Sequence, residues 1–88
     1  MDYEKYQEFS EFLKTIAHPT RLTLLQMIRK GEPCVKDMHE SLDLSQPNIS
    51  RHLGLLRNAH VVESICQGNK RCYRLLDQRV NDILDVLT

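Results

Sequence analysis

The 88-residue sequence has no long apolar run, few glycines and an odd number of cysteines. No segment approaches the roughly 20 apolar residues that cross a bilayer, and the start "MDYEKYQEF" is not a signal peptide. We therefore expect a cytoplasmic chain with no membrane partner. The 3 glycines form no phosphate-binding loop, and no metal-ligand spacing indicates an enzyme. The length allows one domain, residues 1–88, whose small core favours a partner subunit.

The cysteines, Cys34, Cys66 and Cys72, stand at irregular spacings. An odd count without a regular framework is typical of thiols in a reducing compartment rather than of a disulfide-bonded secreted domain. We therefore expect these cysteines to be reduced.

The formal net charge is zero, but the charges are unevenly distributed along the chain. Residues 1–44 carry six Lys and Arg against eight Asp and Glu, whereas residues 45–74 carry five against Glu63 alone. Residues 75–88 carry one against three. A basic middle third is typical either of a nucleic-acid-binding surface or of a solvated basic face.

Hydrophobic spacing and capping residues predict three helices in the first half of the chain. Asp2 is a good N-cap for a helix over about 3–16, and Pro19 suits the first turn of a second helix. Gly31 ends that helix, and a short third helix follows at about 35–42.

The second half is predicted to contain a fourth helix, a β-hairpin and a last helix. Ser45 is a good N-cap for the fourth helix. The hydrophobic period then changes to that of short strands, and Gly68-Asn69 is typical of a two-residue hairpin turn. Asp77 caps the last helix, over about 78–87.

Two short helices joined by a tight turn, over about 35–58, indicate a helix-turn-helix whose second helix enters a DNA major groove. The hairpin, over about 61–76, is then a wing with a basic tip. The predicted fold class is mainly α with a β-hairpin wing, a winged helix-turn-helix that binds double-stranded DNA. The alternative is a winged-helix protein–protein interaction module without sequence-specific DNA binding. The predicted DNA contacts are Ser45, Gln46, Pro47, Asn48, Ser50, Arg51, His52, Asn69, Lys70 and Arg71.

The stretches "HPTRLTLLQMI", "LDLSQPNISRHLGLLRNAHVVES" and "GNKRCYRL" resemble the ArsR/SmtB family of bacterial repressors. The resemblance runs from about Phe9 to Leu87. It implies a homodimeric regulator that binds an operator over its own promoter and releases it when an inducer binds. It also implies a dimer interface made by the first helix, about 3–16, and the last, about 78–87. The residues expected there are Tyr6, Phe9, Leu13, Val80, Ile83, Leu84 and Leu87.

Members of this family sense metals, arsenite, persulfides or oxidants, and two of the family's metal sites are incomplete here. The Cys-x-Cys of arsenite and lead sensors becomes Cys34-Val35-Lys36, and a protonated lysine binds no metal ion. In the zinc pattern of the last helix, Asp77 is kept but Arg79 replaces a histidine.

The candidates for metal or redox sensing are Cys34, Cys66, Cys72 and His39. With the predicted turn, Cys66 opposes Arg71, so the thiols of Cys66 and Cys72 point to opposite faces of the hairpin. Cys34 paired with a hairpin cysteine, within or across protomers, would make a redox or soft-metal switch. The other interpretation is that all three thiols are small apolar residues. The predicted function requires no cofactor, and arsenite, cadmium, zinc and thiol oxidation are all open as inducers.

Overall fold

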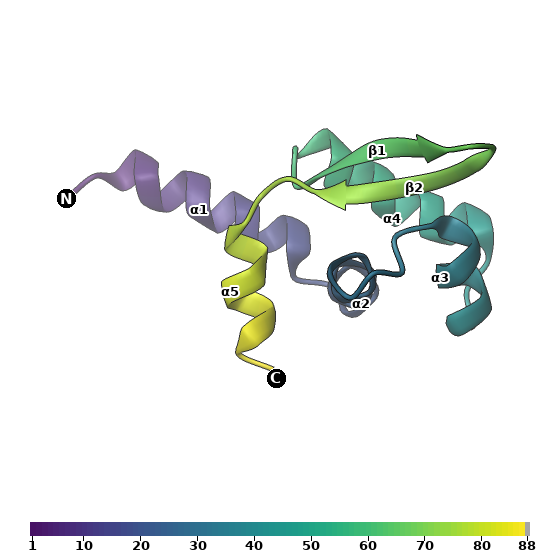
Figure 1. Ribbon diagram of the computed structural model, residues 1–88. Coiled ribbons are helices and arrows are strands. Elements are labelled where there is room, and N and C mark those ends of the chain that lie inside the picture. The colour runs from purple at the N-terminus through teal and green to yellow at the C-terminus, as the bar shows by residue number, and fades with distance from the viewer. Residues whose placement is uncertain (88) are drawn as a thin grey trace.

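The computed structural model describes residues 1–87, which form five helices and one antiparallel hairpin (Figure 1). In chain order these are α1 (Tyr3–Ile16), α2 (Pro19–Arg29), α3 (Val35–Ser41), α4 (Gln46–Asn58), β1 (Val62–Gln67), β2 (Lys70–Leu75) and α5 (Arg79–Asp85). The order confirms the predicted winged helix-turn-helix, with α3 and α4 as its two helices and the β1–β2 hairpin as its wing. None of these helices is long and apolar enough to cross a membrane.

Two helices begin at the predicted N-caps. The Asp2 carboxylate accepts a hydrogen bond from the backbone N–H of Lys5 (3.2 Å) at the start of α1. The Ser45 hydroxyl accepts one from the N–H of Asn48 (3.2 Å) at the start of α4. Each bond satisfies a backbone donor that has no partner inside the helix.

The hydrophobic core lies between α2, α3, α4 and the wing. Leu25 of α2 and Met38 of α3 are fully buried with Ile49 and Leu53 of α4. Tyr73 of β2 is 4% exposed and packs in the same cluster, so it anchors the wing to the helices. With its apolar side buried in this way, α4 presents its opposite side to solvent.

The wing has the predicted register. Gly68 and Asn69 form the two-residue turn, and Gly68 has a φ of +68°, in the left-handed region that glycine favours. Cys66 lies opposite Arg71. Cys66 is exposed and Cys72 is buried, which confirms that their side chains point to opposite faces.

The segment immediately before α3 pairs with the free edge of β2. Cys34 and Cys72 form an isolated antiparallel bridge, and the N–H of Tyr73 donates to the carbonyl oxygen of Pro33 (3.0 Å). Two residues are too few to show strand periodicity, so the sequence did not indicate this pairing. It fixes β2 between β1 and the start of α3.

The last helix begins at Arg79. This is one residue later than an N-cap at Asp77 predicts, because Gln78 is the N-cap residue. Asp77 still accepts a hydrogen bond from the N–H of Arg79 (3.1 Å), and its carboxylate pairs with the Arg79 guanidinium (2.6 Å). This hydrogen bond to the guanidinium lowers the pKa of Asp77. The guanidinium also lies over the ring of Phe12 (3.9 Å), so it links α5 to α1.

Two residues expected at a dimer interface are buried within the protomer. Val80 is 0% exposed and Leu84 is 2% exposed, and α5 packs on α2. The prediction was wrong for this pair because a stripe at i, i+3, i+4 and i+7 is broad enough for one edge to enter the domain's own core. The other expected residues remain outside it: Tyr6, Phe9, Leu13 and Leu87 are exposed and Ile83 is half-buried.

Candidate nucleic-acid interface

The first turns of α4 present polar side chains away from the core. Ile49 is buried, whereas Gln46 in the first turn and Arg51 are exposed. The Arg51 Nη2 donates a hydrogen bond to Oδ1 of Asn48 (2.9 Å), which aligns the two side chains along one face of the helix. Of the contacts predicted on α4, Ser45, Gln46, Pro47 and Arg51 are exposed and Asn48 and Ser50 are half-buried. This face can therefore supply hydrogen bonds to a groove.

His52 does not lie on this face, contrary to the prediction. Its side chain is 6% exposed and its ring lies 4.6 Å from the ring of His18. The Arg21 Nη1 donates to Nδ1 of His52 (3.2 Å), because a guanidinium has no acceptor. His52 follows Ile49 by three residues, so both lie on the inward side of the helix. Burial lowers the pKa of His52, and the charges of His18, Arg21 and Arg51 lower it further.

The tip of the wing carries positive charge that has no acidic partner. Asn69, Lys70 and Arg71 are exposed, and neither cation forms a salt bridge with any residue of the described chain. Further down the wing, Arg74 pairs with Glu63 on the opposite strand (2.8 Å) and is neutralised. The positive charge of the wing is therefore concentrated at its tip.

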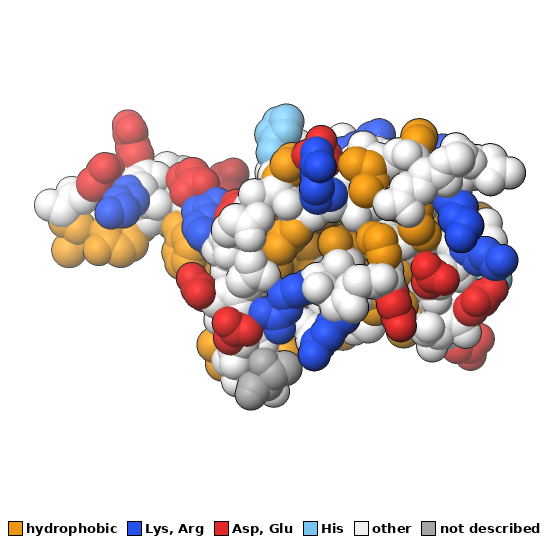
Figure 2. Space-filling view, in the orientation of Figure 1, with side chains coloured by type: hydrophobic (Ala, Val, Ile, Leu, Met, Phe, Trp, Pro, Cys, Tyr) orange, Lys and Arg blue, Asp and Glu red, His pale blue; other side chains and the backbone are white. Residues whose placement is uncertain are grey.

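A recess of about 440 Å³ lies between the start of α3, the start of α4 and the wing tip. We call it the basic recess. Its polar lining comprises Lys36 from α3, Gln46 and Ser50 from α4, and Asn69, Lys70 and Arg71 from the wing, with Cys34 and Val35 also lining it. Figure 2 shows Lys and Arg side chains at this end of the molecule, below the tip of the hairpin. The recess brings together five of the predicted DNA contacts.

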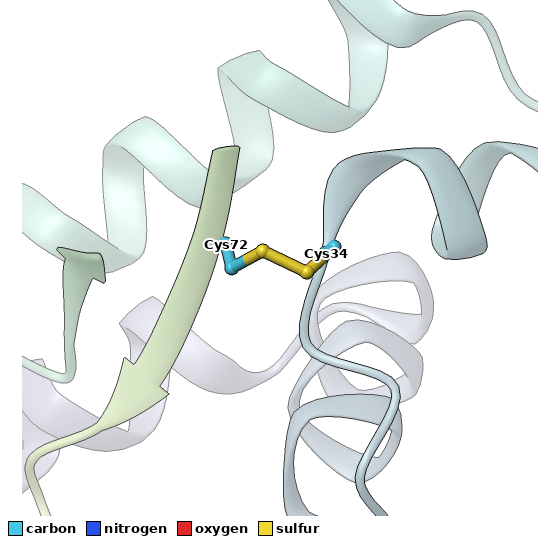
Figure 3. Close-up of a disulfide and its surroundings, with 2 residues drawn as sticks. All are labelled: Cys34 and Cys72. Atoms are coloured by element: carbon cyan, nitrogen blue, oxygen red, sulfur yellow. A yellow bond between two sulfur atoms is a disulfide. The ribbon is translucent and has the colours of Figure 1, made fainter. Parts of the chain in front are cut away.

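Cys34 and Cys72 are joined by a disulfide (Figure 3), with their Cα atoms 3.9 Å apart. This corrects the expectation that all three cysteines are reduced. The two residues lie opposite each other because the segment before α3 pairs with β2, and both are buried. Cys66 is unpaired and exposed on the other side of the hairpin. The disulfide ties the wing to the helix-turn-helix beside the basic recess.

His39 does not join the cysteines. Its Nδ1 donates a hydrogen bond to the carbonyl oxygen of Leu44 (2.7 Å), which holds the ring near the turn between α3 and α4. Within residues 1–87, no group of three or more His, Cys, Asp or Glu side chains could hold a metal ion. Of the four sensing candidates, the structure therefore brings together only Cys34 and Cys72.

Lys36 is the residue of the basic recess that the charge pattern missed. It belongs to the acidic stretch 1–44, so a count along the chain gave no reason to group it with the wing. In the Cys-x-Cys pattern of arsenite sensors, Lys36 stands only where a second thiol is missing. The signal that finds it is spatial, because the α3–β2 pairing brings it near Lys70 and Arg71.

Residues 18–64, which include α2, α3 and α4, match the family described as "Bacterial regulatory protein, arsR family". The chain belongs to the ArsR family. The members of this family are DNA-binding transcriptional regulators rather than enzymes, which confirms both the resemblance and the expected class of protein.

Similar proteins include repressors of known sequence and structure. This ArsR-family protein is 36% identical over 86 residues to an arsenical resistance operon repressor of Staphylococcus xylosus, covering 93% of this chain and 82% of that protein. It is 35% identical over 80 residues to a biofilm growth-associated repressor of Agrobacterium fabrum, covering 91% and 68%. The crystal structure of the transcriptional repressor PagR of Bacillus anthracis matches it with a TM-score of 0.83, 30% identity and coverage of 99% and 100%.

Proposed function

We propose that this ArsR-family protein is a homodimeric repressor that binds an operator over its own promoter and releases it when an inducer alters its cysteines. The observation that supports this function most directly is the shared face of α4 and the wing. The polar start of α4 and the basic wing tip line one recess, so both can touch one DNA duplex. A module that binds only proteins does not require Gln46, which can contact bases, to lie beside the unpaired cations Lys70 and Arg71.

The contacts can be assigned by chemistry. Gln46 and Asn48 carry amides that pair with an adenine edge, and Arg51 pairs with guanine or a phosphate. Ser45 and Ser50 supply hydroxyls to phosphates. Pro47 supplies no donor, and its place at the start of α4 lets Gln46 and Asn48 approach the groove.

The exposed apolar side chains of α1 and of the residues that follow α5 support a dimer. Tyr3, Tyr6 and Phe9 of α1 are exposed, as are Val86 and Leu87 immediately after α5. Apolar side chains gather along one side of the projecting α1 helix in Figure 2. A contiguous exposed apolar surface marks a protein–protein contact. A symmetric dimer that reads two half-sites requires its two copies of α4 to lie about 34–36 Å apart, one turn of DNA.

The pair Cys34 and Cys72 is the proposed point of inducer action. A hydroperoxide takes two electrons and two protons from the two thiols, which leaves the disulfide, an alcohol and one water molecule. The backbone pairing already holds β2 beside the start of α3, and the covalent bond further restricts the adjustment of the wing to the DNA backbone. The reduced protein then binds the operator and the oxidised protein releases it. A soft metal ion would find two sulfur ligands here, and no third ligand is grouped with them in residues 1–87.

Operator binding is tested by fluorescence anisotropy of the reduced protein with a labelled duplex from the region upstream of its own gene. We expect tight, salt-dependent binding that unlabelled operator displaces far better than a scrambled duplex. Arg51→Ala and Gln46→Ala should each weaken operator binding by about 5-fold to 150-fold per half-site, because each base contact contributes about 1–3 kcal/mol.

Arg57→Ala is the matched control, since it removes an exposed cation from the opposite end of the same helix. We expect it to bind the operator as wild type does. Wild-type affinity in both Arg51→Ala and Gln46→Ala would show that α4 does not read the operator. Weak, salt-insensitive binding by the wild type would favour the protein–protein module instead.

A further inference from the structure

The basic recess contains three cations and no carboxylate. Lys36, Lys70 and Arg71 line it, and none of them forms a salt bridge within residues 1–87. Other arginines of the same chain are paired: Arg29 with Asp85 (2.7 Å) and Arg74 with Glu63 (2.8 Å). The recess thus gathers positive charge that the protein itself does not neutralise, which is the electrostatic character of an anion-binding site.

The three cations come from two segments that are far apart in the sequence. Lys36 lies in the first turn of α3 and is exposed, whereas its neighbour Val35 is buried in the core and orients the turn. In a helix-turn-helix the first helix crosses the DNA backbone while the second enters the groove. Lys36 is therefore on the element that passes closest to a phosphate.

The walls of the recess are held together by the backbone as well as by sulfur. The hydrogen bond from Tyr73 N–H to the Pro33 oxygen (3.0 Å) lies beside the Cys34–Cys72 bridge. This hydrogen bond involves no sulfur atom, so the same backbone pairing can hold the walls of the recess when the two cysteines are reduced. Ser50, from α4, adds a hydroxyl that can donate to an anionic oxygen.

We infer that the basic recess receives one phosphodiester group of the operator backbone, held by Lys36 together with Lys70 and Arg71. This inference rests on the proposed DNA-binding function and adds Lys36 to its contacts. The source is the DNA backbone rather than free phosphate, because the recess opens beside Gln46, which α4 presents for base contact. Lys36 adds affinity but no sequence preference, since every nucleotide carries the same phosphate.

The test is the salt dependence of operator binding by reduced wild type and Lys36→Gln. Each lost phosphate contact lowers the slope of log affinity against log salt by about 0.9, so a dimer that loses two contacts loses about 1.8. The ratio of wild-type to variant affinity should then shrink about tenfold as salt rises from about 0.05 to about 0.2 M. The preference for operator over scrambled duplex should stay the same.

Lys5→Gln is the control, because it removes the same charge near the N-terminus, at the opposite end of the molecule from the wing tip (Figure 1). Its slope should equal that of the wild type. A Lys36→Gln slope equal to wild type, with normal operator binding, would overturn the inference and leave the proposed function intact. Failure of the wild type to bind the operator would overturn both.

A further arm separates the two sources of phosphate. Inorganic phosphate and chloride are compared as competitors of operator binding at matched ionic strength. We expect phosphate to compete no better than chloride, because one isolated anion lacks the neighbouring groove contacts. Competition by phosphate at micromolar concentration, abolished in Lys36→Gln, would assign the recess to a free anion and overturn the backbone assignment.

Discussion

His52 is a histidine in the middle of a DNA-reading helix that serves the protein's own packing. Its neutral ring accepts a hydrogen bond from Arg21 and lies against His18. The Nδ1 of His18 in turn accepts the N–H of Thr20 (3.1 Å) and caps α2. The groups that face His52 are thus His18, the N-cap of α2, with Arg21 from α2 and Arg51 from α4, and each disfavours a positive charge on the His52 ring.

The free energy of unfolding should therefore fall on mild acidification. The pKa of His52 in the folded protein is held below its ordinary value of 6.5. The stability that the neutral ring contributes is therefore complete above about pH 6.5, and it is lost as the pH falls from there through the lower pKa of the folded state. Urea unfolding at about pH 7.5 and about pH 5.5 measures the loss. His52→Gln should reduce the pH dependence, whereas His60→Gln, at an exposed site, should retain it. An unchanged pH dependence in His52→Gln would contradict the proposed role of the buried neutral ring.

Among the secondary-structure elements, those set by local signals were predictable from the sequence. Ser45 begins α4 and Gly68-Asn69 turns the wing because capping and turn geometry involve only neighbouring residues. The inward position of Val80 depends on α2, which is remote in the sequence, and periodicity cannot tell the domain's own core from a partner. The position of Lys36 beside the wing could not be predicted for the same reason, because it depends on β2, which is remote in the sequence.

The disulfide likewise depends on a contact between segments that are remote in the sequence, β2 and the start of α3. The hairpin register excluded a bond between Cys66 and Cys72, and it left Cys34 as a partner for either. Only the pairing of the Pro33–Cys34 segment with β2 selects Cys72. Because that pairing is two residues long, no sequence pattern could have chosen between the candidates.

Oxidation should weaken operator binding through this bond. Anisotropy with the operator duplex is measured for protein treated with an organic hydroperoxide and for protein kept in a thiol reductant. We expect at least a tenfold loss of affinity on oxidation, reversed by reduction, in wild type and Cys66→Ser. Cys34→Ser should bind equally well under both conditions. Equal affinity of oxidised and reduced wild type, with the disulfide confirmed by mass spectrometry, would show that this pair is not the sensor.

The whole molecule has an extended shape in which α1 leaves apolar surface exposed. In Figure 1, α1 projects from the body that α2, α3, α4 and the wing form. Phe12 and Ile16 attach its second half to the core, whereas Tyr6 is 61% exposed in its first half. An 88-residue chain has a small core, so in the proposed dimer a second copy that covers this apolar surface would add substantially to stability. We therefore argue that folding and dimerisation are linked.

Tyr6→Ser should shift the protein toward monomer without disturbing the core. Truncation of a buried interface tyrosine costs about 2 kcal/mol in each protomer, so the dimer Kd should rise roughly 1,000-fold when both copies are changed. Sedimentation velocity over a range of protein concentrations measures this shift. Leu55→Ser, which removes an apolar side chain of similar exposure (48%) from α4, should leave the dimer unchanged. The monomeric variant should also bind the operator more weakly, because two half-sites then have to be occupied independently. Equal dimer Kd values for Tyr6→Ser and wild type would place the dimer contact elsewhere than on α1.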